Sequence, residues 1–286
     1  MKLRQILTLS LIFLVTVLVR NYRLSDTFIF GEDQEDLSLR VRQIIIDHQP
    51  TLISAKFSSL GFYLPPGYLY LLSPFFLLTN FHPATGQMIV VLFAGVTGIL
   101  LYLAGGWLAW YLYLTSPLLH QYDRIFWNPN LILPASALVA LAIVRKRPFL
   151  AAIASGLALQ SHPQAILLAL LTFLYFRRHW LLILGVILLF ISPLILFEIR
   201  HGFTLTHNIL SAQSSFTLRP YYFLFLAPPL IIIISRFFKS LWLIIFILTT
   251  IRFAYVLSSL TPNPHALPHK QTAAEIEKIN ELVETM

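Results

Sequence analysis

The chain has 286 residues, of which 57% are hydrophobic and only 11% are charged. Because soluble domains carry about 25% charged residues, this composition excludes an ordinary soluble protein and predicts an all-α, polytopic membrane helical bundle. The absence of cysteine excludes a disulfide framework, a thiol nucleophile and a cysteine-based zinc site. The net charge of +8 fits lysine and arginine at the ends of membrane spans better than nucleic-acid binding.

The N-terminal segment predicts a membrane span that is not cleaved. Residues 1–4 are basic and residues 6–19 are apolar, as in a signal peptide. The next residues run from Arg20 to Arg23 and lack the small side chains of a cleavage site. We therefore expect an N-terminus in the cytoplasm.

The longest polar region, residues 20–67, begins directly after this span. Its acidic stretch, Glu32, Asp33, Glu35 and Asp36, holds four of the twelve carboxylates of the chain. A solvated acidic loop is the simplest interpretation of the stretch by itself. Residues 37–46 follow with an amphipathic pattern, which is typical of a helix in the membrane interface.

The rest of the chain is a series of apolar runs with polar connectors. The run Tyr68–Thr79 contains Pro74 and is shorter than the roughly twenty residues that a span needs. Further apolar runs lie at 88–104, 107–119, 131–144, 149–159, 165–176, 181–197, 221–234 and 241–257, of which 149–159 and 165–176 are also short. We expect a transmembrane domain at 1–258 and a short outer tail at 259–286, with one amphipathic helix at 273–283.

The basic connectors predict the orientation of the spans. Residues 145–147, 177–178 and 236–239 contain arginine and lysine but no acid, which places them in the cytoplasm. The acidic stretch, the connectors near 119–130 and 160–164, and the C-terminus then lie outside. The acidic stretch and the connector near 119–130 are both outside, so the number of membrane crossings between them must be even. Three apolar runs lie between them, and Tyr68–Thr79 is the one predicted not to cross. About nine spans of the plasma membrane remain.

The outer loops carry polar motifs in a definite order. A Leu-Pro-Pro-Gly-Tyr segment at 64–68 follows the acidic stretch; residues 122–124 are Tyr-Asp-Arg, residues 127–130 are Trp-Asn-Pro-Asn, and residues 160–163 are Gln-Ser-His-Pro. With these motifs in this order on one side of the membrane, the chain resembles the GT-C superfamily of integral-membrane glycosyltransferases. Within it, the chain is most similar to the bacterial relatives of protein mannosyltransferases and of the aminoarabinose transferase that acts on lipid A. The resemblance covers residues 1–260.

The resemblance implies a transferase that moves a sugar, with inversion, from a polyprenyl-phosphate donor to a hydroxyl group outside the membrane. The acceptor would be a glycan, a lipid or a protein. Asp33 matches the position of the family's catalytic carboxylate best, and the local order of acids leaves Glu32 and Asp36 as alternatives. Many relatives continue into an outer domain where this chain stops, so we expect acceptor binding to be incomplete or supplied by a partner.

Such a transfer needs a base for the acceptor hydroxyl, and cations or hydrogen-bond donors for the departing phosphate. The acidic stretch could supply the base. The candidate substrate-binding residues are Arg124, His162, Lys56, Arg40, Arg42, Tyr122 and Asn128. Structural roles compete with these: Arg124 could form a local ion pair with Asp123, and His162 could cap a helical hairpin. Arg252, inside the last apolar run, is interpreted as an interfacial anchor.

No cofactor is expected beyond the lipid-linked donor. A divalent metal on Asp33, Asp36 and a histidine is conceivable, but no tight ligand spacing supports it. The competing functions are a transporter or lipid flippase and a non-catalytic scaffold of the same fold. Transporters usually show two related halves and charges near mid-membrane, and the sequence shows neither.

Overall fold

The computed structural model describes residues 3–28, 30–57, 62–82, 84–211, 220–237 and 242–258. The helices are α1 (Leu3–Asn21), α2 (Leu24–Thr27), α3 (Glu32–Ile45), α4 (Gly67–Leu78), α5 (Thr85–Leu114), α6 (Pro117–Tyr122), α7 (Ile132–Val144), α8 (Pro148–Leu159), α9 (Ala165–Tyr175), α10 (Trp180–Arg200), α11 (Thr204–Ser211), α12 (Ala227–Phe237) and α13 (Trp242–Ser258). Short 3₁₀ turns are η2 (Asn128–Leu131), η3 (Arg177–His179) and η4 (Pro220–Leu226). In these ranges the strands are a single antiparallel pair, β1 (Lys56–Phe57) and β2 (Phe62–Tyr63). The all-α prediction is confirmed; the expected helix at 273–283 lies outside the described residues.

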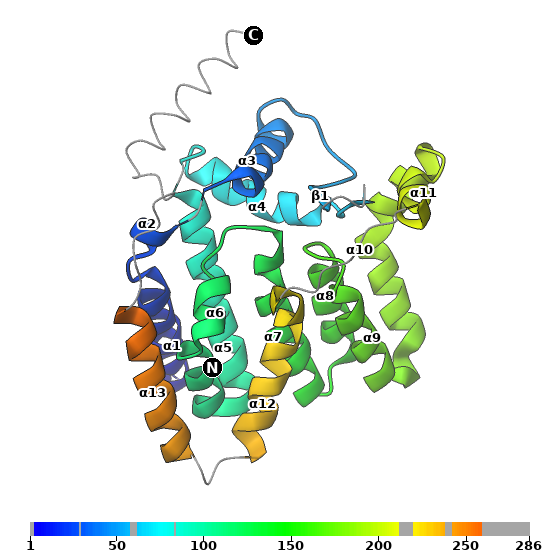
Figure 1. Ribbon diagram of the computed structural model, residues 1–286. Helices are drawn as coiled ribbons and strands as arrows, with labels where there is room; N and C mark the ends of the chain where they lie inside the picture. The colour runs from blue at the N-terminus through cyan, green and yellow to red at the C-terminus, as the bar shows by residue number, and fades with distance from the viewer. Residues whose placement is uncertain are drawn as a thin grey trace.

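The longer helices stand side by side, and α3 and α4 lie over one end of the bundle, which we name the α3 end (Figure 1). Three described segments are long and apolar enough to cross a membrane: Leu3–Asn21, Thr85–Leu114 and Arg177–Arg200. Leucine and isoleucine side chains are exposed along α9 and α10, as expected for helices that face lipid. The molecule therefore has the character of a membrane protein.

Helix α5 is a hairpin rather than one straight rod. Gly106 has φ 78° and ψ −166°, outside the helical region, and the hydroxyl of Tyr113 lies 3.4 Å from the carbonyl oxygen of Ala94. In a straight helix, 19 residues would separate these groups by about 28 Å. The chain thus reverses at Gly106, as the separate apolar runs at 88–104 and 107–119 predict. The first arm, residues 85–105, is about 32 Å long, the thickness of a bilayer core.

Small residues allow the central helices to pack closely. Alanines dominate the buried faces of α7 and α8, including Ala140 and Ala154. A Cβ atom on Gly156 of α8 would lie 2.4 Å from the ring of Phe190, so only glycine lets α10 approach this far. Such small-residue contacts are the usual basis of helix association in lipid, where burial of apolar surface contributes little.

The acidic stretch is part of a helix, which corrects the expectation of a loop. Helix α3 begins at Glu32, five residues before the predicted start at residue 37. The side chain of Gln34 folds back and accepts a hydrogen bond of 2.9 Å from the amide of Gly31, which closes the N-terminus of the helix. Carboxylates in a first turn are stabilised by the positive end of the helix dipole. The amphipathic pattern beyond residue 37 is real, but it describes only the later turns.

Candidate functional site

Four segments distant in sequence meet at the α3 end, and we name their meeting place the polar junction. It comprises the first turn of α3 (32–36), the start of α4 (66–70), residues 122–131 and the turn at 160–164. Three hydrogen bonds hold it together: Gln34 Nε2 donates to the carbonyl oxygen of Phe126 (2.6 Å), Tyr68 Oη to that of Trp127 (3.1 Å), and the amide of Gly67 to Gln160 Oε1 (2.7 Å). The sequence motifs that suggested a common site are therefore neighbours.

The acidic turn presents Asp33 to solvent at the edge of this junction. Partial burial raises the pKa of Asp33, and the nearby charges of Glu32 and Asp36 raise it further. Asp36 has a partner of its own, because Arg40 Nε lies 2.8 Å from its carboxylate. Asp33 is exposed, forms no ion pair with any described residue, and has a pKa that its surroundings raise.

The other expected cations of the first outer loop are separated from one another. Arg40 is one helical turn from Asp36, and the guanidinium of Arg42 approaches Asp47 at 3.9 Å. Lys56 lies on β1 with an exposed side chain. Lys56 is therefore the cation of this loop that stays without an ion pair in the described part of the chain.

A buried charged network links α1 to the hairpin of α5. Arg20, at the end of α1, is fully buried and donates from Nε to Asp123 Oδ2 at 2.9 Å. Its terminal nitrogens donate to the carbonyl oxygens of Tyr113 (2.9 Å) and Leu114 (2.8 Å). The hydroxyl of Tyr113 donates to the same carboxylate oxygen at 2.6 Å. This network joins the C-terminal end of α5 to the C-terminal end of α1.

Arg124 does not pair with Asp123, so the local ion pair considered from the sequence is wrong. Its guanidinium instead donates to the carbonyl oxygen of Tyr22 (3.0 Å) and to Thr27 Oγ1 (2.8 Å), and it lies 2.6 Å from His120 Nε2. Burial is the main cause that lowers the pKa of Arg124, to about 10, so the group still carries its charge at neutral pH.

His120 joins the two arginines. Its Nδ1 atom lies 3.2 Å from a terminal nitrogen of Arg20, while Nε2 faces Arg124, and the ring is almost fully buried. Sequence reasoning missed both Arg20 and His120, because the contacts of Arg20 with Asp123 and with His120 join residues about a hundred positions apart along the chain.

The remaining predicted residues lie within the polar junction. His162 is buried in the turn between α8 and α9, where desolvation lowers its pKa to about 4, and its Nδ1 accepts from the amide of Gln164 (3.3 Å). It is thus neutral at pH 7, and the expected switch to a charged form does not fall in the physiological range. The ring of Tyr122 stacks on Trp127 with centroids 6.2 Å apart. The buried Oδ1 atom of Asn128 has no hydrogen-bond partner among the described residues.

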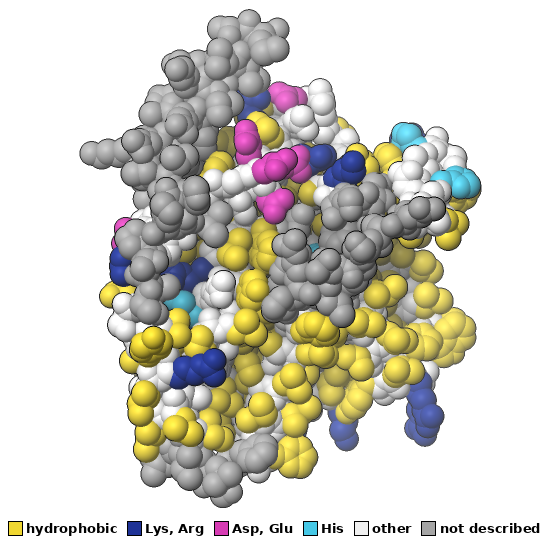
Figure 2. Space-filling model, in the orientation of Figure 1, with side chains coloured by type: hydrophobic (Ala, Val, Ile, Leu, Met, Phe, Trp, Pro, Cys, Tyr) yellow, Lys and Arg dark blue, Asp and Glu magenta, His cyan; other side chains and the backbone are white. Residues whose placement is uncertain are grey.

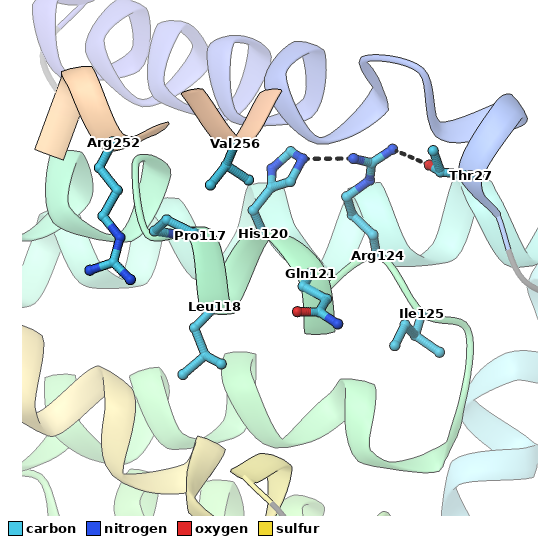
Figure 3. Close-up of a pocket in the computed structure, with 9 residues that line it drawn as sticks. All are labelled: Thr27, Pro117, Leu118, His120, Gln121, Arg124, Ile125, Arg252 and Val256. Carbon is cyan, nitrogen blue, oxygen red and sulfur yellow. Dashed lines mark hydrogen bonds between the residues drawn. The ribbon is translucent and has the colours of Figure 1, made fainter. Parts of the chain in front are cut away.

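A pocket of about 450 Å³ lies beside this junction, between α6 and α13 (Figure 3). The described residues of its walls include two arginines, Arg124 and Arg252, and no carboxylate. The described residues that line it are Thr27, Pro117, Leu118, His120, Gln121, Arg124, Ile125, Arg252 and Val256. Arg252 was expected to anchor the last helix at the interface, and in the structure its side chain also borders this pocket.

Comparisons with known proteins supply no relative. No family model matches the chain, and no characterised protein or solved structure is significantly similar to it. Among the described residues there is also no group of three or more histidine, aspartate or glutamate side chains that could hold a metal ion. The interpretation of the site therefore depends on its own geometry.

Proposed function

We propose that the chain is a membrane glycosyltransferase that moves a sugar from a polyprenyl-phosphate donor to a hydroxyl acceptor, with inversion. The observation that supports this most is Asp33, an exposed carboxylate with a raised pKa at the edge of the polar junction of a membrane-type bundle. A general base works best when its pKa approaches the working pH, and its acceptor must reach it from solvent.

The roles within the junction follow from the contacts. Asp33 takes the proton of the acceptor hydroxyl, while Glu32 contributes negative charge that keeps the pKa of Asp33 high. The charge of Asp36 is balanced by Arg40. These two residues therefore have a supporting role, and Asp33 is left as the base. His162 of the junction and Lys56 of β1, which lies outside the junction, are assigned to the donor phosphate, and Asn128 and Tyr122 to the sugar. The contacts of Arg124 favour a position at the neighbouring pocket over one on the donor.

The same proposal includes an orientation in the membrane. On the face in Figure 2, acidic side chains lie towards the α3 end, and the opposite end shows basic side chains without acids. The basic connector Arg145-Lys146-Arg147 joins α7 to α8 at that opposite end. The positive-inside rule then puts the α3 end outside the plasma membrane. Nine crossings result if both arms of α5 cross, the second continued by α6, and α4 stays in the interface.

A conversion assay tests the function. Protein in lipid nanodiscs is incubated with polyprenyl phosphates that carry radiolabelled hexoses or pentoses, together with extracted membrane acceptors. The proposal predicts release of free polyprenyl phosphate and a labelled acceptor. Intact donor after long incubation with every sugar, in folded protein, would contradict it.

The buried ion pair supports a second candidate, a lipid flippase or transporter. Arg20, Asp123 and His120 are buried inside the bundle, and ionisable groups inside a membrane often mark transport pathways. A flippase would move a fluorescent polyprenyl-phosphate sugar across liposomes without breaking it. An enzyme would convert the lipid on the outer leaflet and leave its distribution unchanged.

A further inference from the structure

The C-terminal end of α10 marks the level of a membrane surface. The segment Arg177–Arg200 is long and apolar enough to cross a membrane, and most of its side chains are exposed. Within α10 the charged residues are Glu198 and Arg200, and both lie in its last turn. Because a charged side chain is costly in hydrocarbon, this turn is where the helix leaves the apolar core of the bilayer.

Helix α11 is tied to this level by its first turn. The chain leaves α10 through Gly202 and Phe203, whose φ angles are 64° and 59°. The carboxylate of Glu198 then accepts hydrogen bonds from the amides of Leu205 and Thr206, both of 2.9 Å, and from the hydroxyl of Thr206 at 2.6 Å. These bonds satisfy amides that the start of a helix leaves free. Helix α11 is therefore held beside the end of α10, at the α3 end of the bundle (Figure 1).

Helix α11 has one apolar side and one polar side. Since an α-helix turns about 100° per residue, Leu205, Ile209 and Leu210 share one side. The polar residues of the other side are Thr204, His207, Asn208 and Ser211. Leu205 is buried and α11 contacts β2, but Ile209 is 46% exposed and Leu210 is 79% exposed. Strand β2 thus covers only part of the apolar side.

The bilayer is the apolar surroundings closest to the exposed part of this side. Exposed apolar side chains run along α10 up to Ile199 and continue with Phe203 in the connection to α11. Ile209 and Leu210 extend the same lipid-facing surface beyond the end of α10. A helix that is anchored at the end of a membrane span can reach the lipid headgroups without any movement of the bundle.

We propose that α11 is an interfacial helix, with Ile209 and Leu210 inserted into the lipid and the polar side towards water. Amphipathic helices of this kind bury their apolar side about 5–10 Å into the boundary between headgroups and acyl chains. The proposal depends neither on the glycosyltransferase function nor on which side of the membrane the α3 end faces.

An anchored α11 would hold the β1–β2 hairpin at the membrane surface. Helix α11 contacts β2, and β2 pairs with β1 so that Tyr63 lies opposite Lys56. The lipid would therefore fix, through α11, the height of this hairpin relative to the membrane.

Spin labels on α11 in lipid nanodiscs test the proposal. The chain has no cysteine, so Leu210→Cys and Asn208→Cys can each carry one nitroxide. Both side chains are exposed and lie on opposite sides of the helix, so both variants should fold. The Leu210 label should be more accessible to oxygen, which concentrates in lipid, than to a water-soluble nickel complex. The Asn208 label should show the reverse order.

Two further labels provide the references: Leu189→Cys, on the exposed face of α10, for lipid, and Glu35→Cys, on α3, for water. A Leu210 label that behaves like the Glu35 label would place the apolar side in water and overturn the proposal. Low accessibility to both reagents would show that protein covers this side, from this chain or a second copy, and would also overturn it. A depth equal to that of the Leu189 label would mean that α11 inserts into the bilayer core, which contradicts an interfacial position.

Discussion

Asp33 owes its raised pKa to three causes, of which partial burial is the largest and the charges of Glu32 and Asp36 follow. A base acts in its deprotonated form, so activity should rise with pH through the pKa of Asp33. Glu32→Gln removes a negative neighbour and should lower that pKa, which moves the acidic limb of the rate profile to lower pH. Measured pH–rate profiles check this; an unmoved or oppositely moved limb would separate Asp33 from the rate.

Arg20 and Asp123 form a buried pair whose members depend on each other. Arg20→Ala should destabilise the protein by about 3–5 kcal/mol, because it leaves the carboxylate of Asp123 buried without a counter-charge. The double variant Arg20→Met with Asp123→Leu should be less destabilised than Arg20→Ala, since neither charge remains. Thermal unfolding in one detergent measures both. A double variant that is worse than the single would show that the pair does more than balance charge.

For single residues, the sequence indicated which side chains could take part in chemistry but not which other residues they contact. The cluster of acids and the motifs at 122–130 and 160–163 were visible as patterns, and the structure brings their segments together. In the sequence, Arg20 is only the first residue after an apolar run, and nothing near it reveals that its partner is Asp123. A buried hydrogen bond between helices is a tertiary property, and local patterns do not encode it.

Among the elements, the α5 hairpin gives the clearest prediction. The backbone of Gly106 has a positive φ with an extended ψ, a region that is essentially restricted to glycine, and a Cβ there would contact nothing within 4 Å. Gly106→Ala should therefore destabilise by about 1–3 kcal/mol through backbone strain alone. The measurement is thermal unfolding in a fixed detergent.

Gly185→Ala on α10 is the matched control, because its added Cβ also meets nothing, while the backbone is helical. It should be neutral or stabilise by up to about 1 kcal/mol, as alanine usually does in a helix. Equal effects of the two substitutions would contradict a reversal that depends on Gly106.

Element positions were largely predictable, since apolar run lengths and basic connectors mark where helices end. The expected turn near residues 161–163 falls between α8 and α9, and the expected short helix at 68–79 is α4. The start of α3 was not predicted, because its first turn is polar on all sides and apolar periodicity cannot detect it. What marks the start of the helix in the structure is the hydrogen bond from the amide of Gly31 to the side-chain oxygen of Gln34, which forms only in the folded turn.

For the whole molecule, the orientation in the membrane remains a prediction that labelling can check. The chain has no cysteine, so single cysteines can be introduced without background. Cysteines at Thr51 and Asn263 should react with an impermeant thiol reagent in intact cells, and one at Lys146 should react only after the cells are opened. Protection at Thr51 together with labelling at Lys146 would reverse the orientation.

The central claim is that Asp33 is the base of a transferase, and one comparison tests it most directly. Single-turnover transfer from a radiolabelled polyprenyl-phosphate sugar is measured for Asp33→Asn and for Glu35→Gln, which removes an exposed acid from the same helical turn. The account predicts that Asp33→Asn slows transfer by roughly 10²–10⁴-fold with donor binding retained, whereas Glu35→Gln stays near the wild-type rate. Near-normal transfer by folded Asp33→Asn protein would contradict it.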